Sequence, residues 1–195
     1  MTGPFQTILT DTPAPAVLRV TLNRPDVANA FNTQMMRDLL ALWQDLAVDP
    51  APPRCIVLTG AGHRAFCAGA DLKERNTLSE AQWMAQHVII EEQFKALIEC
   101  PIPVIAAVNG HAFAGGLEIL LGCDFAYAVK EARFALTEVT LGLMPGAGGT
   151  QTLPRAVGER RAKEIILTGR PFAAQQALDW GVVNALYEPD ALMQD

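Results

Sequence analysis

The chain has 195 residues, of which 50% are hydrophobic, and a formal net charge of −6 at pH 7. This length suits a single domain covering residues 1–195, and the apolar content is sufficient for a sizeable core. The acidic balance argues against non-specific binding to nucleic acid or to an anionic membrane.

Targeting and redox features indicate a cytoplasmic protein. No apolar run is long enough to span a bilayer, and the N-terminal sequence lacks a basic region followed by an apolar core. No C-x-x-C pair occurs, and we expect the four cysteines to be reduced, mostly buried thiols. They are Cys55, Cys67, Cys100 and Cys123.

The first part of the chain predicts two strands and a helix. Residues 5–10 and 17–22 are expected to be strands joined by a proline-containing turn at 11–15. A helix is predicted to begin after Asn32, which is its N-cap. Its buried stripe is expected to contain Met35, Met36, Leu39, Leu40, Trp43 and Leu46.

The middle of the chain alternates short apolar runs with helical patterns. Residues 54–59 and 104–108 are apolar and predict central strands. A helix is predicted near Asp71, and Ser79 has the spacing of a capping box that opens a long helix. The apolar side of the long helix is expected to contain Trp83, Ile90, Phe94, Leu97 and Ile98.

The last part of the chain continues this alternation. Short strands are predicted at 124–129, 133–135 and 182–186, and helices near 153–157, 160–167 and 173–180. Strands that alternate with helices along the whole chain indicate an α/β fold.

The stretch at 109–124, NGHAFAGGLEILLGCD, offers the clearest candidate site. Gly115 and Gly116 carry no Cβ, so another molecule can approach their backbone closely. The helical pattern that begins at Leu117 would present unpaired N–H groups at its positive end, where an oxygen that becomes negative during a reaction could bind. The alternative interpretation is a tight turn that lets the helix pack against a strand.

Two carboxylates occur within apolar segments, Glu118 in GGLEILL and Glu138 in FALTEVTLG. If both lay in one apolar pocket, desolvation would raise the pKa of one or both carboxyls. One could then deprotonate a water while the other protonates a carbon. The alternatives are a Glu118 side chain that reaches water and an ordinary strand-end position for Glu138.

Other chemistries find little support in the sequence. Ser79 is the only serine, and its expected role as a helix cap argues against a serine hydrolase. The three histidines, His63, His87 and His111, lack metal-ligand spacing, so no metal site is expected. Cys67 lies in a glycine-rich loop without an evident paired base, which favours a small buried residue over a nucleophile.

Five motifs resemble, in order, those of the crotonase (enoyl-CoA hydratase/isomerase) superfamily. They are NRPDVANAFN at 23–32, AFCAGADLKER at 65–75, PVIAAVNGHAFAGGLEILLGCD at 103–124, FALTEVTLGLMPGAGGTQTLPRAVG at 134–158 and ILTGRPFAAQQALDWGVVN at 166–184. Together they cover nearly the whole chain. The resemblance implies a spiral of β-β-α units and an acyl-CoA thioester that lies across two loops.

The resemblance also implies roles for individual residues. The backbone N–H groups of Ala70 and Gly115 would form an oxyanion hole, while Glu118 as base and Glu138 as acid would add water to a 2-enoyl-CoA. No metal or redox cofactor would be needed, because coenzyme A is part of the substrate. The implied contacts to CoA are Ala68, Asp71, Leu72, Lys73 and Gly116, with Lys73 reaching a phosphate.

The strings GADLKER and GGLE resemble the methylglutaconyl-CoA hydratase branch, which would allow a branched-chain substrate. An enoyl-CoA isomerase or another acyl-CoA enzyme is an alternative function. A non-catalytic or RNA-binding member is a further alternative, although the acidic charge disfavours it.

Three departures from the family pattern stand out. Ala114 replaces a glycine found in many relatives, Thr152 replaces a common arginine, and the chain ends at Asp195, where relatives usually continue through further helices. Such helices cover the acyl pocket and pack between subunits of a trimer or a dimer of trimers. In their absence we expect an exposed apolar patch that favours self-association.

Overall fold

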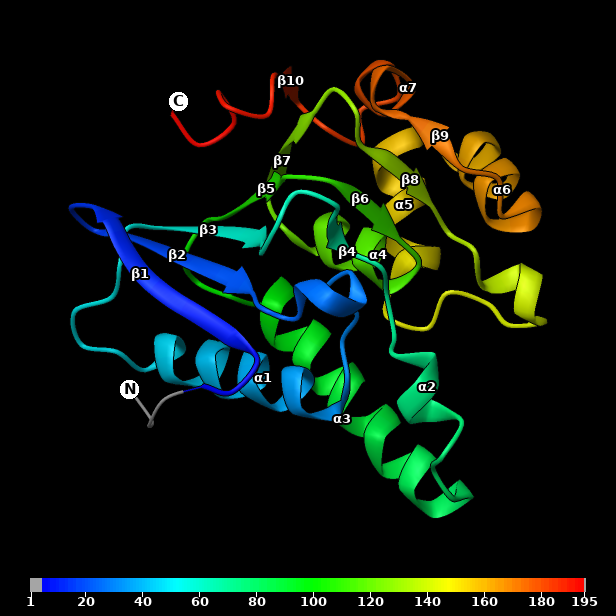
Figure 1. The fold of residues 1–195 in the computed structure, drawn as a ribbon, viewed down its shortest axis with the longest axis horizontal. Helices are drawn as coiled ribbons and strands as arrows, with labels where there is room; N and C mark the ends of the chain where they lie inside the picture. Colours follow the sequence, from blue (N-terminus) through cyan, green and yellow to red (C-terminus); the bar gives the residue numbers. More distant parts are fainter. Residues whose placement is uncertain (1–4, 195) are drawn as a thin grey trace.

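Two β-sheets form the framework of the chain, which this computed structural model describes from residue 5 to residue 194. The larger sheet has the strand order β1-β2-β3-β5-β7-β10 (Figure 1). Its strands are β1 Ile8–Ala14, β2 Val17–Leu22, β3 Cys55–Gly60, β5 Val104–Val108, β7 Phe125–Val129 and β10 Ala185–Tyr187. β1 runs antiparallel to β2, and the other neighbouring strands pair in parallel.

The smaller sheet has the order β4-β6-β8-β9. Its strands are β4 Ala65–Cys67, β6 His111–Phe113, β8 Arg133–Ala135 and β9 Phe172–Ala173. The chain passes from β3 to β4, from β5 to β6 and from β7 to β8, and each such pair is followed by a helix. The predicted α/β spiral of β-β-α units is therefore confirmed, although β4 and β6 are too short to show a strand pattern in the sequence.

Helices cover the sheets, and α1 and α3 pack side by side along one face of the larger sheet (Figure 1). The α-helices are α1 Thr33–Ala47, α2 Leu72–Arg75, α3 Glu80–Ile98, α4 Gly115–Gly122, α5 Gly149–Val157, α6 Glu159–Thr168 and α7 Ala174–Asp179. Two 3-10 helices, η1 Pro25–Val27 and η2 Glu138–Leu141, lie in the connections.

The beginnings of α1 and α3 were predicted correctly. The side chain of Asn32 accepts a hydrogen bond from the backbone N of Met35 at 3.0 Å, as an N-cap does. Ser79 and Gln82 form the reciprocal pair of a capping box at the start of α3. In α1 the buried stripe includes Leu42, which was not predicted, whereas Leu40 is only half-buried.

The first predicted turn was wrong. β1 continues through residues 11–14 and pairs with β2 up to Ala14, so that the connection is only Pro15 and Ala16. Pro13 is tolerated within the strand because β1 lies at the edge of the sheet, where a missing N–H need not break a ladder.

The predicted apolar stripe of α3 was partly wrong. Ile90, Phe94 and Leu97 are buried, but Trp83 and Ile98 are exposed. The ring of Trp83 instead stacks on His87, with centroids 5.2 Å apart, and the guanidinium of Arg75 lies over it. The buried face of the helix contains Gln86 and Gln93 in addition to the three apolar residues.

The last strand begins later than predicted. Val182 and Val183 are buried, but their N–H groups donate to the carbonyl of Ala177 and close the end of α7. Strand β10 forms only after this turn. Apolar runs of this length do not reveal whether their backbone groups pair with a strand or with a helix end.

Exposed apolar side chains lie at the end of η2 and just after it. Leu141, Leu143 and Met144 expose 57%, 54% and 68% of their surface. The exposed apolar patch expected from the sequence stays a prediction, as does self-association through it.

Candidate active site

The loop after β4 and the turn before α4 approach each other closely. A Cβ built on Gly69 would lie 3.1 Å from the backbone N of Gly115 and 2.9 Å from the Cβ of Ala114. Gly69 also has a φ of 92°, a left-handed value that favours glycine. The two segments that carry the predicted oxyanion donors therefore lie side by side.

The backbone around Ala70 is held by one strand-like contact with Phe31. The N–H of Phe31 donates to the carbonyl of Gly69, and the N–H of Asp71 donates to the carbonyl of Phe31, both at 2.9 Å. In a parallel bridge of this kind the middle residue directs its own N–H to the opposite side. The N–H of Ala70 thus points away from Phe31 and is left available for another acceptor.

Glycines at the start of α4 allow very close packing. A Cβ on Gly116 would lie 2.0 Å from the carbonyl O of Cys67, and a Cβ on Gly115 would lie 2.5 Å from the ring of Phe31. The tight-turn interpretation of these glycines is therefore confirmed. It does not exclude an anion site, because the first N–H groups of α4 have no acceptor within the helix. Ala114, before Gly115, has φ 49° and ψ −126°, which L-residues rarely adopt.

Glu118 lies in the buried part of α4, with 3% of its surface exposed. Its Oε1 accepts hydrogen bonds from the backbone N–H groups of Ala147 and Gly149, both at 2.8 Å. Burial raises the pKa of this carboxyl, and the two backbone bonds oppose the increase. The carboxylate is fixed by the loop before α5, and the alternative in which it reaches water is wrong.

Glu138 begins η2, three residues after the end of β8, and is half-buried. Its Oε2 is buried and has no hydrogen-bond partner among the described residues. Burial, together with the negative charge of Glu118, raises the pKa of Glu138 to about 7. The two predicted catalytic carboxylates are therefore close enough to interact, and they differ in hydrogen bonding.

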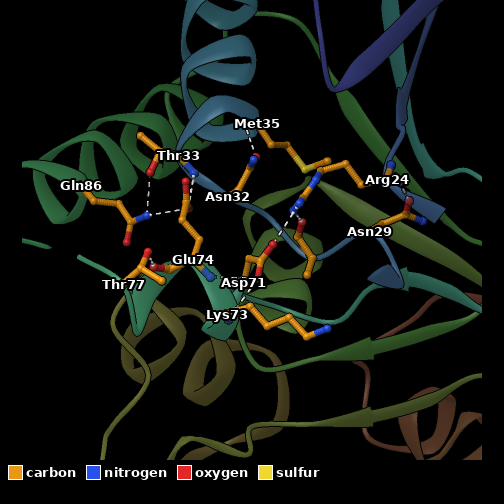
Figure 2. Close-up of polar contacts among 11 residues, drawn as sticks. Arg24, Asn29, Asn32, Thr33, Met35, Asp71, Lys73, Glu74, Thr77 and Gln86 are labelled. Atoms are coloured by element: carbon orange, nitrogen blue, oxygen red, sulfur yellow. Dashed lines mark hydrogen bonds and ion pairs between the residues drawn. The ribbon is translucent and has the colours of Figure 1, made fainter. Parts of the chain in front are cut away.

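The residues expected to contact CoA lie around the start of α2. Leu72 and Lys73 are exposed and Ala68 is half-buried, so all three can be reached by a ligand. Asp71 is different, because one oxygen accepts from the guanidinium of Arg24 at 2.9 Å and the other from backbone N–H groups of α2 (Figure 2). The amine of Lys73 extends away from these contacts in the same view.

Several residues of this region were not singled out from the sequence. Arg24, Asn29 and Glu74 form a network of polar contacts around residues 69–71, the loop that carries the predicted oxyanion donor Ala70 (Figure 2). Arg24 and Asn29 belong to the motif NRPDVANAFN, which supported the family resemblance. The motif alone did not predict the hydrogen bonds of their side chains. The loop residues Ala147 and Gly149 act through backbone N–H groups, which no side-chain pattern reveals.

The remaining candidates show no catalytic arrangement. Cys67 is buried, and desolvation raises the pKa of its thiol to about 12, which supports its interpretation as a packing residue. Within residues 5–194 we find no group of three or more His, Cys, Asp or Glu side chains that could hold a metal ion. No helix in that range is long and apolar enough to cross a membrane.

Comparison with known proteins places these features in a family context. The family model described as enoyl-CoA hydratase/isomerase matches residues 13–195. The YngF protein of Bacillus subtilis is 46% identical over 174 residues, which cover 89% of this chain and 66% of YngF. The short-chain-enoyl-CoA hydratase of Clostridium acetobutylicum is 40% identical over 174 residues, with the same coverages of 89% and 66%.

A solved structure is similar over nearly the whole chain. The crystal structure of an enoyl-CoA hydratase from Bacillus anthracis superposes with a TM-score of 0.93 at 42% identity. The match covers 97% of this chain and 73% of that one. This chain thus spans about two thirds of the length of the two curated relatives named above.

Proposed function

Because this chain belongs to the enoyl-CoA hydratase/isomerase family, we propose that it adds water across the 2,3-double bond of a 2-enoyl-CoA thioester. One observation carries the proposal. The buried Glu118, on the helix that begins at Gly115, has its Oε1 held by two backbone N–H groups, whereas the half-buried Glu138 has a buried Oε2 without a partner among the described residues.

Hydration of a conjugated thioester needs stabilisation of an enolate oxygen. When water attacks Cβ, negative charge moves to the thioester oxygen, which would accept hydrogen bonds from the N–H groups of Ala70 and Gly115. A preorganised donor of this kind contributes about 3 kcal/mol to the transition state in other enzymes. The close approach of Gly69 to Gly115 supports this role, because it brings the two segments to one point.

The environments of the two carboxyls support a division of labour. Glu118 is held by two backbone donors that favour its ionised form, so it would orient and deprotonate the attacking water. Glu138 has no such donors at Oε2 and a pKa near 7, so it would be protonated and give its proton to Cα. General acid–base catalysis of this kind contributes roughly a hundredfold to ten-thousandfold.

The CoA moiety would bind beside α2. The contacts proposed for it are the half-buried Ala68, the exposed Leu72 and Lys73, and the backbone at Gly116. The Nζ of Lys73 would pair with a phosphate. The reaction needs no metal or redox cofactor, because the thioester itself is the electron sink.

For the substrate we propose a chemical class, and for the assembly an oligomeric state. A short or branched 2-enoyl-CoA is proposed, in line with the short-chain hydratase among the relatives. We further propose a cytoplasmic homo-oligomer, a trimer or a dimer of trimers, which the exposed apolar residues after η2 would help to form. Sedimentation that gives a monomer at high concentration would contradict the assembly.

The proposed reaction is tested by following the loss of enoyl-thioester absorbance on adding short and branched 2-enoyl-CoAs. Turnover that is lost in Glu138→Gln would support the hydratase with two carboxylates. Absorbance loss without a 3-hydroxyacyl-CoA product would contradict hydration. Migration of the double bond in 3-enoyl-CoA, without added water, would instead favour the isomerase alternative that the family name includes.

A further inference from the structure

The guanidinium of Arg24 joins two segments that are far apart in the sequence. Its Nη1 donates to the carbonyl of Ala30 at 2.6 Å, and its Nη2 donates to the carboxylate of Asp71 at 2.9 Å (Figure 2). The side chains of Arg24 and Asp71 are 21% and 12% exposed. The pair is therefore shielded from much of the solvent, which strengthens a charge-assisted hydrogen bond.

These two acceptors belong to the two segments that meet at the bridge between Phe31 and Ala70. Ala30 precedes Phe31 in the chain, and Asp71 follows Ala70, while Phe31 and Ala70 form the parallel bridge described above. One planar guanidinium thus connects the two segments whose bridge sets the direction of the Ala70 N–H. A rotation of the Gly69–Ala70 peptide group would break the hydrogen bond from the N–H of Phe31 to the carbonyl of Gly69. That N–H belongs to the same peptide group as the carbonyl of Ala30, which Arg24 holds in place.

The segment before Phe31 is itself held by Arg24. Ala28 and Asn29 have left-handed φ values of 53° and 54°, which fold the chain back after η1. The backbone N–H of Arg24 donates to the side chain of Asn29 at 3.0 Å, and the backbone N–H of Asn29 donates to the carbonyl of Arg24 at 2.9 Å. Arg24 therefore stabilises this turn through hydrogen bonds of its backbone as well as of its side chain.

A second contact holds the segment that follows Asp71. The Oε2 of Glu74, in α2, accepts from the backbone N–H of Thr33 at 2.8 Å and from the side chain of Gln86 at 3.0 Å (Figure 2). It links α2 to the first turn of α1 and to α3. The loop that carries Ala70 is therefore fixed at its carboxyl end as well.

We propose that Arg24, through its ion pair with Asp71, is a positioning residue that directs the N–H of Ala70 towards the thioester oxygen, an inference that rests on the proposed function. Both Nη atoms of Arg24 are occupied by these two acceptors, so we assign Arg24 no direct contact with the substrate. An arginine is required because its planar fork reaches both acceptors at once, whereas a lysine ammonium on a flexible stem does not hold that geometry.

The test replaces Arg24 by lysine and keeps the charge. Arg19→Lys is the matched control, because Arg19 also pairs with an aspartate, Asp11, but at an exposed site between β1 and β2. The expected result is a kcat lowered roughly tenfold to a hundredfold in Arg24→Lys, as for a donor displaced by a fraction of an ångström. KM and the pH dependence of kcat should stay close to wild type, and Arg19→Lys should be unaffected.

A spectroscopic readout separates positioning from stability. 4-(Dimethylamino)cinnamoyl-CoA is a thioester whose absorbance moves to longer wavelength when donors polarise its carbonyl. Bound at saturation, it should show a full shift in wild type and in Arg19→Lys, and a reduced shift in Arg24→Lys. Asp71→Asn, which keeps an acceptor for the N–H groups of α2 but loses the charge, should give an intermediate shift.

The outcomes distinguish this inference from the proposed function. A full shift in Arg24→Lys, with only a lower melting temperature, would overturn the positioning role and leave the hydratase intact. A wild-type chain that shifts the probe but does not hydrate 2-enoyl-CoAs would refute the hydratase, and a reduced shift in Arg24→Lys would still support the positioning role. A wild-type chain that binds the probe without any shift would overturn the positioning role.

Discussion

Glu118 and Glu138 lie close enough for the charge of one to raise the pKa of the other, yet their hydrogen bonds differ. Glu118 accepts two backbone N–H bonds at Oε1, whereas the buried Oε2 of Glu138 has no partner among residues 5–194. Two interacting carboxyls with unequal environments have pKa values that are pushed apart. From this asymmetry we derive the first two predictions.

Replacement of Glu138 by glutamine should lower kcat on a 2-enoyl-CoA by roughly a hundredfold or more, because the amide cannot deliver a proton to Cα. Steady-state kinetics would check this. Glu131→Gln is a suitable control, since Glu131 is an exposed glutamate on the turn before β8. Equal activity of the two variants would show that Glu138 is not the acid.

Folding stability should depend on pH through Glu138. Its pKa is raised from 4.5 to about 7 in the folded chain, so the folded state retains a proton that the unfolded state has lost. Stability should therefore fall as the pH rises from about 4.5 to about 7 and then level off. In urea unfolding, Glu138→Gln should gain stability relative to wild type between pH 5 and pH 8. A difference that is independent of pH would contradict the raised pKa.

The position of Glu118 should depend on the absence of a side chain at Gly149. A Cβ there would lie 2.9 Å from Oε1 of Glu118 and would displace the carboxylate from its two donors. Gly149→Ala should lower kcat by up to about a hundredfold, as expected for a misplaced catalytic group. Gly146→Ala, in the same loop, is the control, because its nearest neighbour would be an atom of His87 at 3.8 Å. A comparable loss of activity in both variants would refute this explanation.

The backbone of Ala114 should be strained, and replacement of Ala114 by glycine should relieve this strain. Its φ of 49° with ψ of −126° costs an L-residue about 1–3 kcal/mol, and part of that is recovered by glycine. Ala114→Gly should raise the free energy of unfolding by about 1 kcal/mol in urea denaturation. The control Ala112→Gly, in β6, should instead lower it by about 1 kcal/mol. Destabilisation by Ala114→Gly would show that the side chain is needed to fix the start of α4.

The sequence predicted those features that depend on residues close together in the chain. The N-cap at Asn32, the capping box at Ser79 and the buried character of the helix after Gly116 were predicted because each depends on neighbours within a few residues. The two glutamates were singled out because charges are rare in apolar segments. Their proximity depends on the fold, and the family resemblance supplied that expectation.

What the sequence did not reveal depends on contacts between distant segments. β4 and β6 exist because each pairs across the smaller sheet, and three residues carry no period of their own. The guanidinium of Arg24 reaches Asp71 across 47 positions of the chain, and nothing in the local pattern indicates this partner. The donors to Glu118 are backbone groups, which are the same in every non-proline residue.

Two glutamines on the buried face of α3 provide the last prediction. Gln93 is fully buried, and neither atom of its amide has a hydrogen-bond partner among the described residues. Gln86, two turns earlier, donates to the hydroxyl of Thr33 at 2.7 Å and to Glu74 at 3.0 Å. Only the Oε1 of Gln86 lacks a partner among the described residues. A buried amide without any partner costs about 1–3 kcal/mol, whereas the two bonds donated by Gln86 contribute to stability.

Gln93→Met should therefore raise the free energy of unfolding by about 1 kcal/mol, because a flexible apolar side chain of similar length fills the same space. Gln86→Met, the matched control on the same face, should lower it by about 1 kcal/mol or more, since it removes the donor to the Thr33 hydroxyl and one of the two donors to Glu74. Urea unfolding at one pH measures both. Destabilisation by Gln93→Met would contradict the interpretation of this amide as an unpaired, costly group.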